Sequence, residues 1–318
     1  MHYSIAPMHI PDGFLSVFVS ILMWIASILV VSYALRRVKA DLDERQAPLM
    51  GVLAAAIFAG QMLNFVVAGG TSGHLMGAAI ATILLGPWAA TLVMTTVVGV
   101  QALIFQDGGL LALGANIFNM AVIGVTVAYF TYQTVQRLAG GKRWGIFVGG
   151  FLAAWLSIEI AALATGLELA LSGTSPANIA IPAMGGIHAI IGIGEGLITV
   201  GALALIYATR PDLLHAGEGT QKTEKLAILV GLLLALLLAI ASPLASARPD
   251  GLEWVAEQKG FLEATQSPLY QIIPDYAFPG ISNQATATIL AGILGTLVVF
   301  GVALLVAYTR RKRQSPGS

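Results

Sequence analysis

The 318-residue chain contains no cysteine and few charged residues. The absence of cysteine excludes disulfides and thiolate metal sites. Charged residues make up 10% of the chain, whereas soluble domains carry about a quarter. Since 16 basic residues balance 16 acidic ones, the net charge of zero argues against a nucleic-acid partner.

Apolar residues dominate the chain instead. They account for 57% of the sequence, and the mean hydropathy is +0.84. The 36 glycines and 13 prolines also fit membrane helices, in which both residues are commoner than in soluble ones. The composition therefore predicts an all-α, polytopic integral membrane protein.

A helix needs about 20 apolar residues to cross the hydrocarbon core of a bilayer. The third and fourth apolar stretches are short and meet at Gly86-Pro87, a turn signal that favours a tight or re-entrant hairpin over one broken helix. With that hairpin we expect nine spans, at residues 14–35, 49–68, 74–85, 88–104, 110–132, 144–163, 184–208, 226–244 and 285–308.

Clusters of lysine and arginine follow the first, fifth, seventh and ninth spans. Because cytoplasmic loops carry the excess of basic residues, the N-terminus is expected outside and the C-terminus in the cytoplasm. The first span lacks a basic leader and is not expected to be a cleavable signal peptide. The eighth is signal-like, with Ala245-Ser246-Ala247 after it, and we prefer an uncleaved anchor to cleavage there.

A polar stretch at 211–225 predicts a cytoplasmic linker between two modules. The first module, residues 1–210, has seven spans, and the second, residues 226–318, has two. The two spans of the second module flank an outside loop, residues 246–284, that contains Pro249-Asp250-Gly251-Leu252-Glu253. Since this loop is too short to bury a large core of its own, we expect it to pack on the first module.

The five histidines are the candidate metal ligands: His2, His9, His74, His188 and His215. On the expected topology, His9 and His74 both lie at the outer surface. Imidazole binds nickel, copper, zinc and cobalt. Each histidine alone is more typical of a hydrogen-bonded structural residue, but the outside pair makes metal ligation an equal alternative.

Polar side chains within membrane spans are costly and need a role. They are Gln61, Asn64, Gln101, Asn116, Asn119, Glu159, His188 and Glu195. For the three asparagines we favour support of the metal ligands over hydrogen bonding between helices. His188 and Glu195 are favoured as packing residues or as a His–Glu pair. Asp12 and Ser72 flank the presumed ligands and are expected to cap or brace them.

Two motifs carry a resemblance to a known family: Met8-His9-Ile10-Pro11-Asp12-Gly13-Phe14 and Thr71-Ser72-Gly73-His74-Leu75. They resemble the CbiM/NikM substrate-binding components of energy-coupling-factor (ECF) transporters for cobalt and nickel. Further matches follow in order, at 61–65, 68–70, 84–89, 101–103, 107–109, 113–120, 186–189 and 191–199. The second module resembles the small N-type partner subunit, of the PDGLE kind and fused to the first.

The resemblance implies a metal site made of the N-terminal amine, the next amide nitrogen, the second residue's imidazole and a later histidine. In this chain these are Met8, His9 and His74. Because residues 1–7 precede Met8, three alternatives stay open: a start at Met8, which we favour, removal of the leader, or Met1-His2 as the chelating pair. Four nitrogens in a plane suit Ni(II) or Cu(II) rather than zinc, magnesium or calcium.

The chain has no Gly-x-x-x-x-Gly-Lys-Ser/Thr loop and is not expected to bind or hydrolyse ATP. The resemblance implies that two ATPase subunits and a transmembrane coupling subunit drive Ni(II) or Co(II) import across a prokaryotic cell membrane, for cobalt in support of cobalamin biosynthesis. The sequence does not distinguish the two ions, although the PDGLE kind favours nickel by resemblance. A proton-coupled carrier using Glu159, Glu195 and His188 is the alternative, and it is disfavoured because no inverted repeat is detectable. A metal-dependent membrane enzyme is weaker still, because no His-Glu-x-x-His helix occurs.

Overall fold

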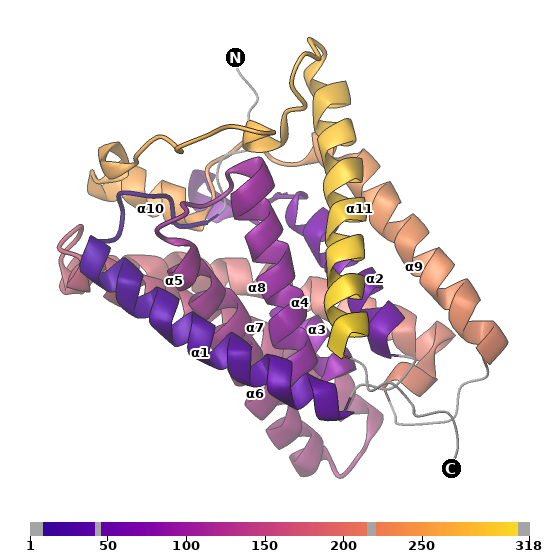
Figure 1. The fold of residues 1–318 in the computed structure, drawn as a ribbon. Helices are drawn as coiled ribbons and strands as arrows, with labels where there is room; N and C mark the ends of the chain where they lie inside the picture. Colours follow the sequence, from indigo (N-terminus) through magenta and orange to yellow (C-terminus); the bar gives the residue numbers. More distant parts are fainter. Residues whose placement is uncertain (1–8, 42–45, 215–220, 311–318) are drawn as a thin grey trace.

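The computed structural model describes residues 9–41, 46–214 and 221–310 (Figure 1). The described chain is predominantly helical, which confirms the all-α membrane fold. The larger helices are α1 (Val17–Asp41), α2 (Gln46–Gln61), α3 (Ala78–Leu85), α4 (Pro87–Val100), α5 (Leu113–Ile117), α6 (Gly124–Ala139), α7 (Arg143–Leu171), α8 (Ala177–Thr209), α9 (Gln221–Ala241), α10 (Gly251–Lys259) and α11 (Gln284–Arg310).

Short elements link these helices. Strands β1 (Phe65–Val66) and β2 (Ser72–Gly73) form an antiparallel pair. The π-helical turns η2 (Gln101–Phe105) and η3 (Phe118–Ile123) continue α4 and join α5 to α6. The remaining turns are 3₁₀-helical: η1 (Ala68–Gly70), η4 (Pro211–Leu213), η5 (Ser242–Leu244), η6 (Leu262–Ala264) and η7 (Pro274–Tyr276).

Seven helical stretches in the described residues are long and apolar enough to span a membrane. We expected nine spans, and the two shorter ones correspond to α2 and α3. With 16 and eight residues, these helices measure about 24 and 12 Å at 1.5 Å per residue. The third crossing is therefore not a helical span, because residues 74–77, which have no regular secondary structure, make up part of it.

The chain turns sharply between α3 and α4, as the Gly86-Pro87 signal predicts. Gly86 has φ of +75°, a conformation that glycine adopts without strain, and Pro87 opens α4. The two arms come back together, because Gln61 donates to the Met76 carbonyl at 2.9 Å and accepts from Gln101 at 2.8 Å. This arrangement is a hairpin, and it places the start of α3 and the end of α4 at the same level of the molecule.

The surface of the bundle is strongly apolar. Only 22% of the most apolar stretch of α1 and 17% of that of α9 is buried. Phe18, Leu29 and Leu237, for example, are 77%, 65% and 59% exposed. Exposed apolar area of this extent in a soluble monomer would drive aggregation, so these faces fit a hydrocarbon surrounding.

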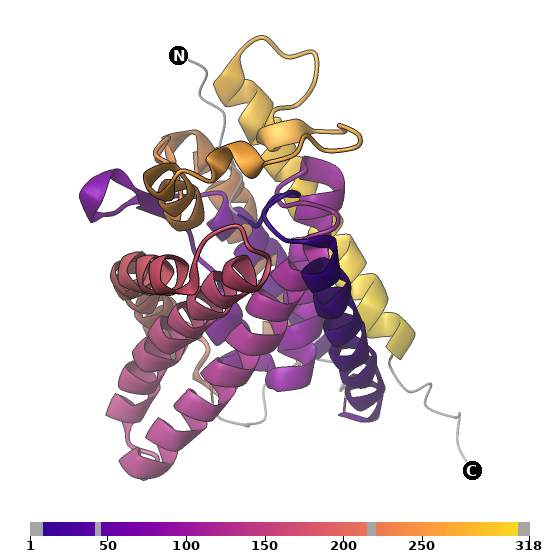
Figure 2. The same cartoon turned by 90° about the vertical axis from the view of Figure 1, so that its left-hand side faces the viewer.

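The loop at residues 246–284 of the second module covers one end of the bundle (Figures 1 and 2). Backbone bonds attach it at separate points: Ser246 N to Asn64 O, Gln266 N to Asp12 O and Ile273 N to Ile104 O, at 2.8, 2.8 and 3.0 Å. The expectation that this loop packs on the first module is confirmed. α9 and α11 meanwhile pack against α2 and each other.

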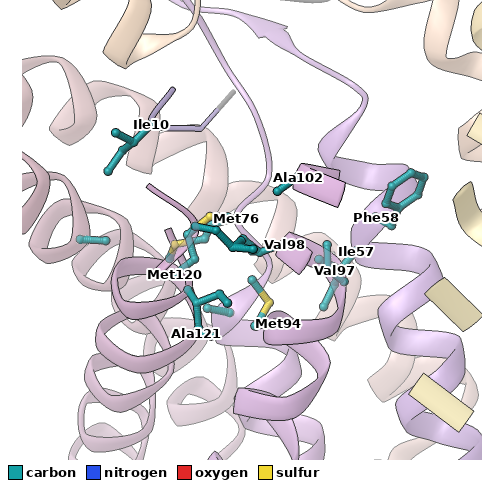
Figure 3. Packing of buried hydrophobic residues seen from close by; sticks show 14 of the residues in the cluster. Ile10, Ile57, Phe58, Met76, Met94, Val97, Val98, Ala102, Met120 and Ala121 are labelled. Atoms are coloured by element: carbon teal, nitrogen blue, oxygen red, sulfur yellow. The ribbon is translucent and has the colours of Figure 1, made fainter. Parts of the chain in front are cut away.

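The N-terminal segment enters the core at the same end. Ile10 and Phe14 are 3% and 1% exposed, and Phe14 packs edge-to-face on Phe261 of the second module with ring centres 5.2 Å apart. Figure 3 shows Ile10 at the outer edge of the apolar cluster that contains Met76 and Met120. The core therefore supports the segment that carries His9.

Candidate metal centre

Asn116 holds the residue after His9 by both of its backbone polar groups. Its side-chain oxygen accepts from Ile10 N at 3.0 Å, and its amide nitrogen donates to Ile10 O, also at 3.0 Å. Gly109 N donates to the same carbonyl at 2.9 Å. Because Asn116 is buried in α5, this clamp fixes the position of the N-terminal segment along the bundle.

Asp12 continues the attachment. Its carboxylate accepts hydrogen bonds from the amides of Leu110, Leu111 and Ala112, at 3.0, 2.8 and 3.1 Å, just before α5 begins. A carboxylate at this place satisfies free amides and interacts favourably with the helix dipole. Gly13 follows with φ of +95°, and a Cβ there would lie 2.0 Å from the Ala264 carbonyl oxygen.

His9 is buried against an acidic partner. Its Nδ1 lies 3.0 Å from Asp107 Oδ1, and Tyr276 donates to Asp107 Oδ2 at 2.6 Å. Burial opposes protonation of His9, but the Asp107 carboxylate outweighs it and raises the His9 pKa above 6.5. The second nitrogen, Nε2, is buried and has no hydrogen-bond partner among the described residues. Asp107 thus orients the ring as carboxylates do for metal-binding histidines.

His74 directly follows β2, and its ring lies next to that of His9. Its Nδ1 lies 3.2 Å from the Leu75 carbonyl oxygen. The His9 and His74 ring centres are 5.8 Å apart, with an angle of 64° between the planes. The structure therefore brings together the two histidines that the sequence places on the same side.

Glu195 fixes the segment that carries His74. Its carboxylate, fully buried in α8, accepts from Met76 N at 2.7 Å and from Gly77 N at 3.0 Å. It therefore caps α3, and neither a packing role alone nor a His–Glu pair describes it. His188 on the same helix binds the Met184 carbonyl through Nδ1 at 2.8 Å instead.

A cavity of about 80 Å³ lies next to the two histidines. This exceeds the volume that one water molecule requires. Its wall includes side chains from both modules: His9, Ile10, His74, Met76, Asn116, Asn119, Met120, Ile158, Ala161, Ala162, Thr165, Met184, His188, Asp250 and Leu252. No group of three or more His, Cys, Asp or Glu side chains in the described ranges is close enough to hold an ion without other donors.

The other predicted supporting residues have diverse surroundings. Asn119 donates to Glu168 and Thr165, at 2.8 and 3.1 Å, and lines the cavity. Ser72 donates to the Arg248 carbonyl at 2.8 Å. The buried side chain of Asn64 has no partner among the described residues and does not line the cavity. Met8 and the alternative pair Met1 and His2 lie outside the described residues.

The sequence analysis did not select Asp107, Asp250 or Tyr276. On the expected topology Asp107 lies just after the fourth span, on the same side as His9, so its position did indicate proximity to His9. Asp250 and Tyr276 lie in the outside loop of the second module and are only 4% and 1% exposed. Burial raises the pKa of Asp250 to about 8. No local pattern in the sequence shows which residues of this loop turn toward the first module.

Comparison with known proteins identifies both parts of the chain that line the cavity. The family model described as cobalt uptake substrate-specific transmembrane region matches residues 9–213, and the PDGLE domain matches residues 225–312. The chain is 38% identical over 309 residues to a putative fused nickel transport protein NikMN of Archaeoglobus fulgidus, covering 96% of this chain and 99% of the relative. It is 34% identical to the cobalt transport protein CbiM of Sorangium cellulosum, over 58% of this chain and 83% of that one.

Solved structures give the same result. The crystal structure of a transition metal transporter is 33% identical, with a TM-score of 0.57, and the match covers 70% of this chain and 99% of that one. A truncated transition metal transporter is 37% identical, with a TM-score of 0.56, over 63% and 98% of the two chains. The motifs around His9 and His74, the helical membrane fold and a match over most of the sequence agree, and the chain belongs to the CbiM family of cobalt uptake substrate-specific transmembrane regions, followed by a PDGLE domain.

Proposed function

We propose that this chain is the substrate-specific membrane subunit of an ECF-type importer for Ni(II) or Co(II), which it captures at the outer surface. The observation that carries the proposal is the meeting of His9 and His74 beside a cavity. Metal–imidazole bonds of about 2.0–2.1 Å place each ring centre about 3 Å from the ion. Two rings whose centres are 5.8 Å apart are therefore within reach of one ion.

For a chain that begins at Met8, the proposed ligand set adds the amine of Met8 and the amide nitrogen of His9. Amine and amide close a five-membered ring, and the amide with Nδ1 of His9 closes a six-membered one. In the structure Nδ1 faces Asp107. Turning the ring by half a rotation exchanges Nδ1 with Cδ2 and brings Nε2 to the side of Asp107. The carboxylate would then still orient the ligating imidazole, as it does in metal sites generally.

The ion's identity remains nickel or cobalt in this proposal. Relatives of the chain are named for nickel transport and for cobalt transport. The fused nickel transport protein NikMN of Rhodobacter capsulatus is 31% identical, and the match covers 96% of this chain and 99% of that one. Similarity to fused chains of this kind favours nickel as the first ion to test.

The proposed assembly places the N-terminus outside and the C-terminus in the cytoplasm of a prokaryotic cell. The two modules, residues 1–210 and 226–318, are joined by a cytoplasmic linker at 211–225. A transmembrane coupling subunit and two ATPase subunits would supply the energy. Support comes from the basic residues, because Arg36, Arg137 and Arg143 lie at helix ends that point away from the cavity.

The proton-coupled carrier has less support. Among the described residues, no hydrogen bond joins the three proposed relay groups to one another. Glu195 is engaged by two backbone amides, His188 by a carbonyl, and one oxygen of Glu159 has no partner. A proton relay requires connected groups, and these three side chains do not form a chain.

The test is Ni²⁺ and Co²⁺ binding to the purified chain in nanodiscs, compared with His74→Ala. The variant should lose high-affinity binding and keep its cooperative melting, because His74 is part-buried at the end of a short strand. Metal content per chain and dissociation constants measure the effect. Equal binding by the two proteins would remove His74 from the site.

A further inference from the structure

The PDGLE segment of the second module lies directly on the strand that leads to His74. Pro249 O accepts from Ser72 N at 2.8 Å and from the Thr71 hydroxyl at 3.0 Å. Arg248 O accepts from the Ser72 hydroxyl at 2.8 Å. These contacts link residues nearly 180 positions apart along the chain, and they fix the two segments relative to each other.

Gly251 sets how closely the segment approaches the cavity. A Cβ at this position would lie 2.8 Å from His188 Cε1 and 2.7 Å from Ile191 Cδ1. Real Cβ atoms are essentially never found at such distances, so a larger residue would have to displace the ends of these two side chains. The close contact also places the preceding residue, Asp250, in the wall of the cavity beside His9 and His74.

Asp250 is a carboxylate with few partners. It is 4% exposed, and Oδ1 accepts from Glu253 N at 2.7 Å as the N-cap of α10. That is the one hydrogen bond that the structure describes for its side chain. Burying a carboxylate is costly unless charge or further hydrogen bonds compensate it. A divalent cation held by the neighbouring histidines would provide that compensation.

We propose that Asp250 stabilises the captured divalent cation through its charge, so that the metal site is complete only with the second module in place. Asp250 is a positioning residue here, because the histidines and N-terminal nitrogens hold the ion. This inference rests on the proposed function. It assigns the PDGLE segment a part in cation capture that packing alone would not give it.

The test separates the charge of Asp250 from its capping hydrogen bond. Asp250→Asn removes the charge and keeps a good N-cap, whereas Asp250→Ala removes both. Glu253→Gln removes a charge from the same helix at a residue that does not line the cavity. Ni²⁺ dissociation constants and the rate of Ni²⁺ release to a chelator are measured on the full chain in nanodiscs, with melting curves of each variant.

We expect Asp250→Asn and Asp250→Ala to weaken Ni²⁺ binding equally, by about 10- to 100-fold, the range for groups that support metal ligands. Only Asp250→Ala should melt at lower temperature, and Glu253→Gln should bind as the parent does. If Asp250→Asn does not melt cooperatively, Asp250→Ser is the second uncharged N-cap.

Each other result overturns the inference in a recognisable way. Parental Ni²⁺ binding by Asp250→Asn would show that the carboxylate only caps α10. Equal weakening by Glu253→Gln would show a general charge effect. If the parent chain itself does not bind Ni²⁺ or Co²⁺, the proposed function fails first, and the role of Asp250 fails with it.

Discussion

The second module contains two regions that differ sharply in how they contact the rest of the protein. Its helix α9 presents mostly exposed apolar side chains, and only 17% of its most apolar stretch is buried. Its loop at residues 246–284, in contrast, buries Asp250 and Tyr276 at the candidate metal centre. The two long helices of the module pack on α2 and expose apolar faces that fit lipid, whereas the loop contacts the candidate metal centre. On the proposed function, the module would affect metal capture through this loop and not through α9.

Metal binding should depend strongly on pH, because amine, amide and imidazole must lose protons to ligate. Asp107 raises the pKa of His9 despite its burial, so protonation competes with the metal. We expect the affinity for Ni²⁺ to fall by about tenfold or more per pH unit as the solution is acidified through this pKa.

The His9–Asp107 pair should affect folding stability with the opposite sign. Because the folded pKa is raised, its contribution is fully present below the ordinary pKa of histidine and is lost as the pH rises through the folded pKa. Melting temperatures and Ni²⁺ dissociation constants across the same pH series measure both effects. A pH-independent affinity would contradict ligation by these groups.

Asp107→Asn should weaken Ni²⁺ binding by about 10- to 100-fold, because the carboxylate orients His9. It should also move the pH at which binding is lost downward, since the neutral amide no longer raises the pKa of His9. Asp275→Asn is the matched control, because Asp275 is exposed and adjoins Tyr276. If the control weakens Ni²⁺ binding as much as Asp107→Asn does, the loss of negative charge near the site, and not the orientation of His9, explains the effect.

Tyr276→Phe should have a smaller effect, because it removes only the hydroxyl that donates to Asp107 at 2.6 Å. A hydrogen bond to a charged group contributes about 1.5–3 kcal/mol to stability. Part of this loss would weaken metal binding, because Asp107 would orient His9 less well. We expect the dissociation constant for Ni²⁺ to be three- to tenfold larger. Tyr270→Phe removes an exposed hydroxyl that binds the Leu103 carbonyl, and parental binding by this control would show that the loop acts through Tyr276.

Leu237→Ala on α9 should have the smallest effect. The side chain is 59% exposed on the face suited to lipid, so the expected change in unfolding free energy is about 0.5 kcal/mol or less. Ni²⁺ binding should be unchanged within error. A large loss of binding would mean that α9 and the loop do not differ in the way described.

The sequence predicted the helical membrane fold because long apolar runs with few charges have no other stable arrangement. It also predicted that His9 and His74 lie on one side, since basic clusters set the topology. It predicted a short third span at 74–85 but not that residues 74–77 are non-helical, because hydropathy does not distinguish a segment whose amides bind a buried Glu195 from a continuous helix.

The supporting residues of the site were predicted less well. Asn116 was selected, and the structure shows how it holds Ile10. Asn64 was selected as well, yet its side chain does not reach the cavity. Asp250 and Tyr276 reach the site only because a loop folds over a distant module. Such contacts depend on tertiary packing and leave no periodic signal in the sequence.

The most direct test of the account is X-ray absorption at the nickel edge of the Ni²⁺-loaded chain, with and without His74→Ala. The account predicts a four-coordinate nitrogen set with two imidazoles in a parent chain that begins at Met8. It predicts the loss of one imidazole ligand in the variant. When one extra residue precedes Met8 and converts its amine into an amide, the four-nitrogen set should be lost. A six-coordinate oxygen-rich spectrum that neither change alters would contradict capture by the N-terminal nitrogens, His9 and His74.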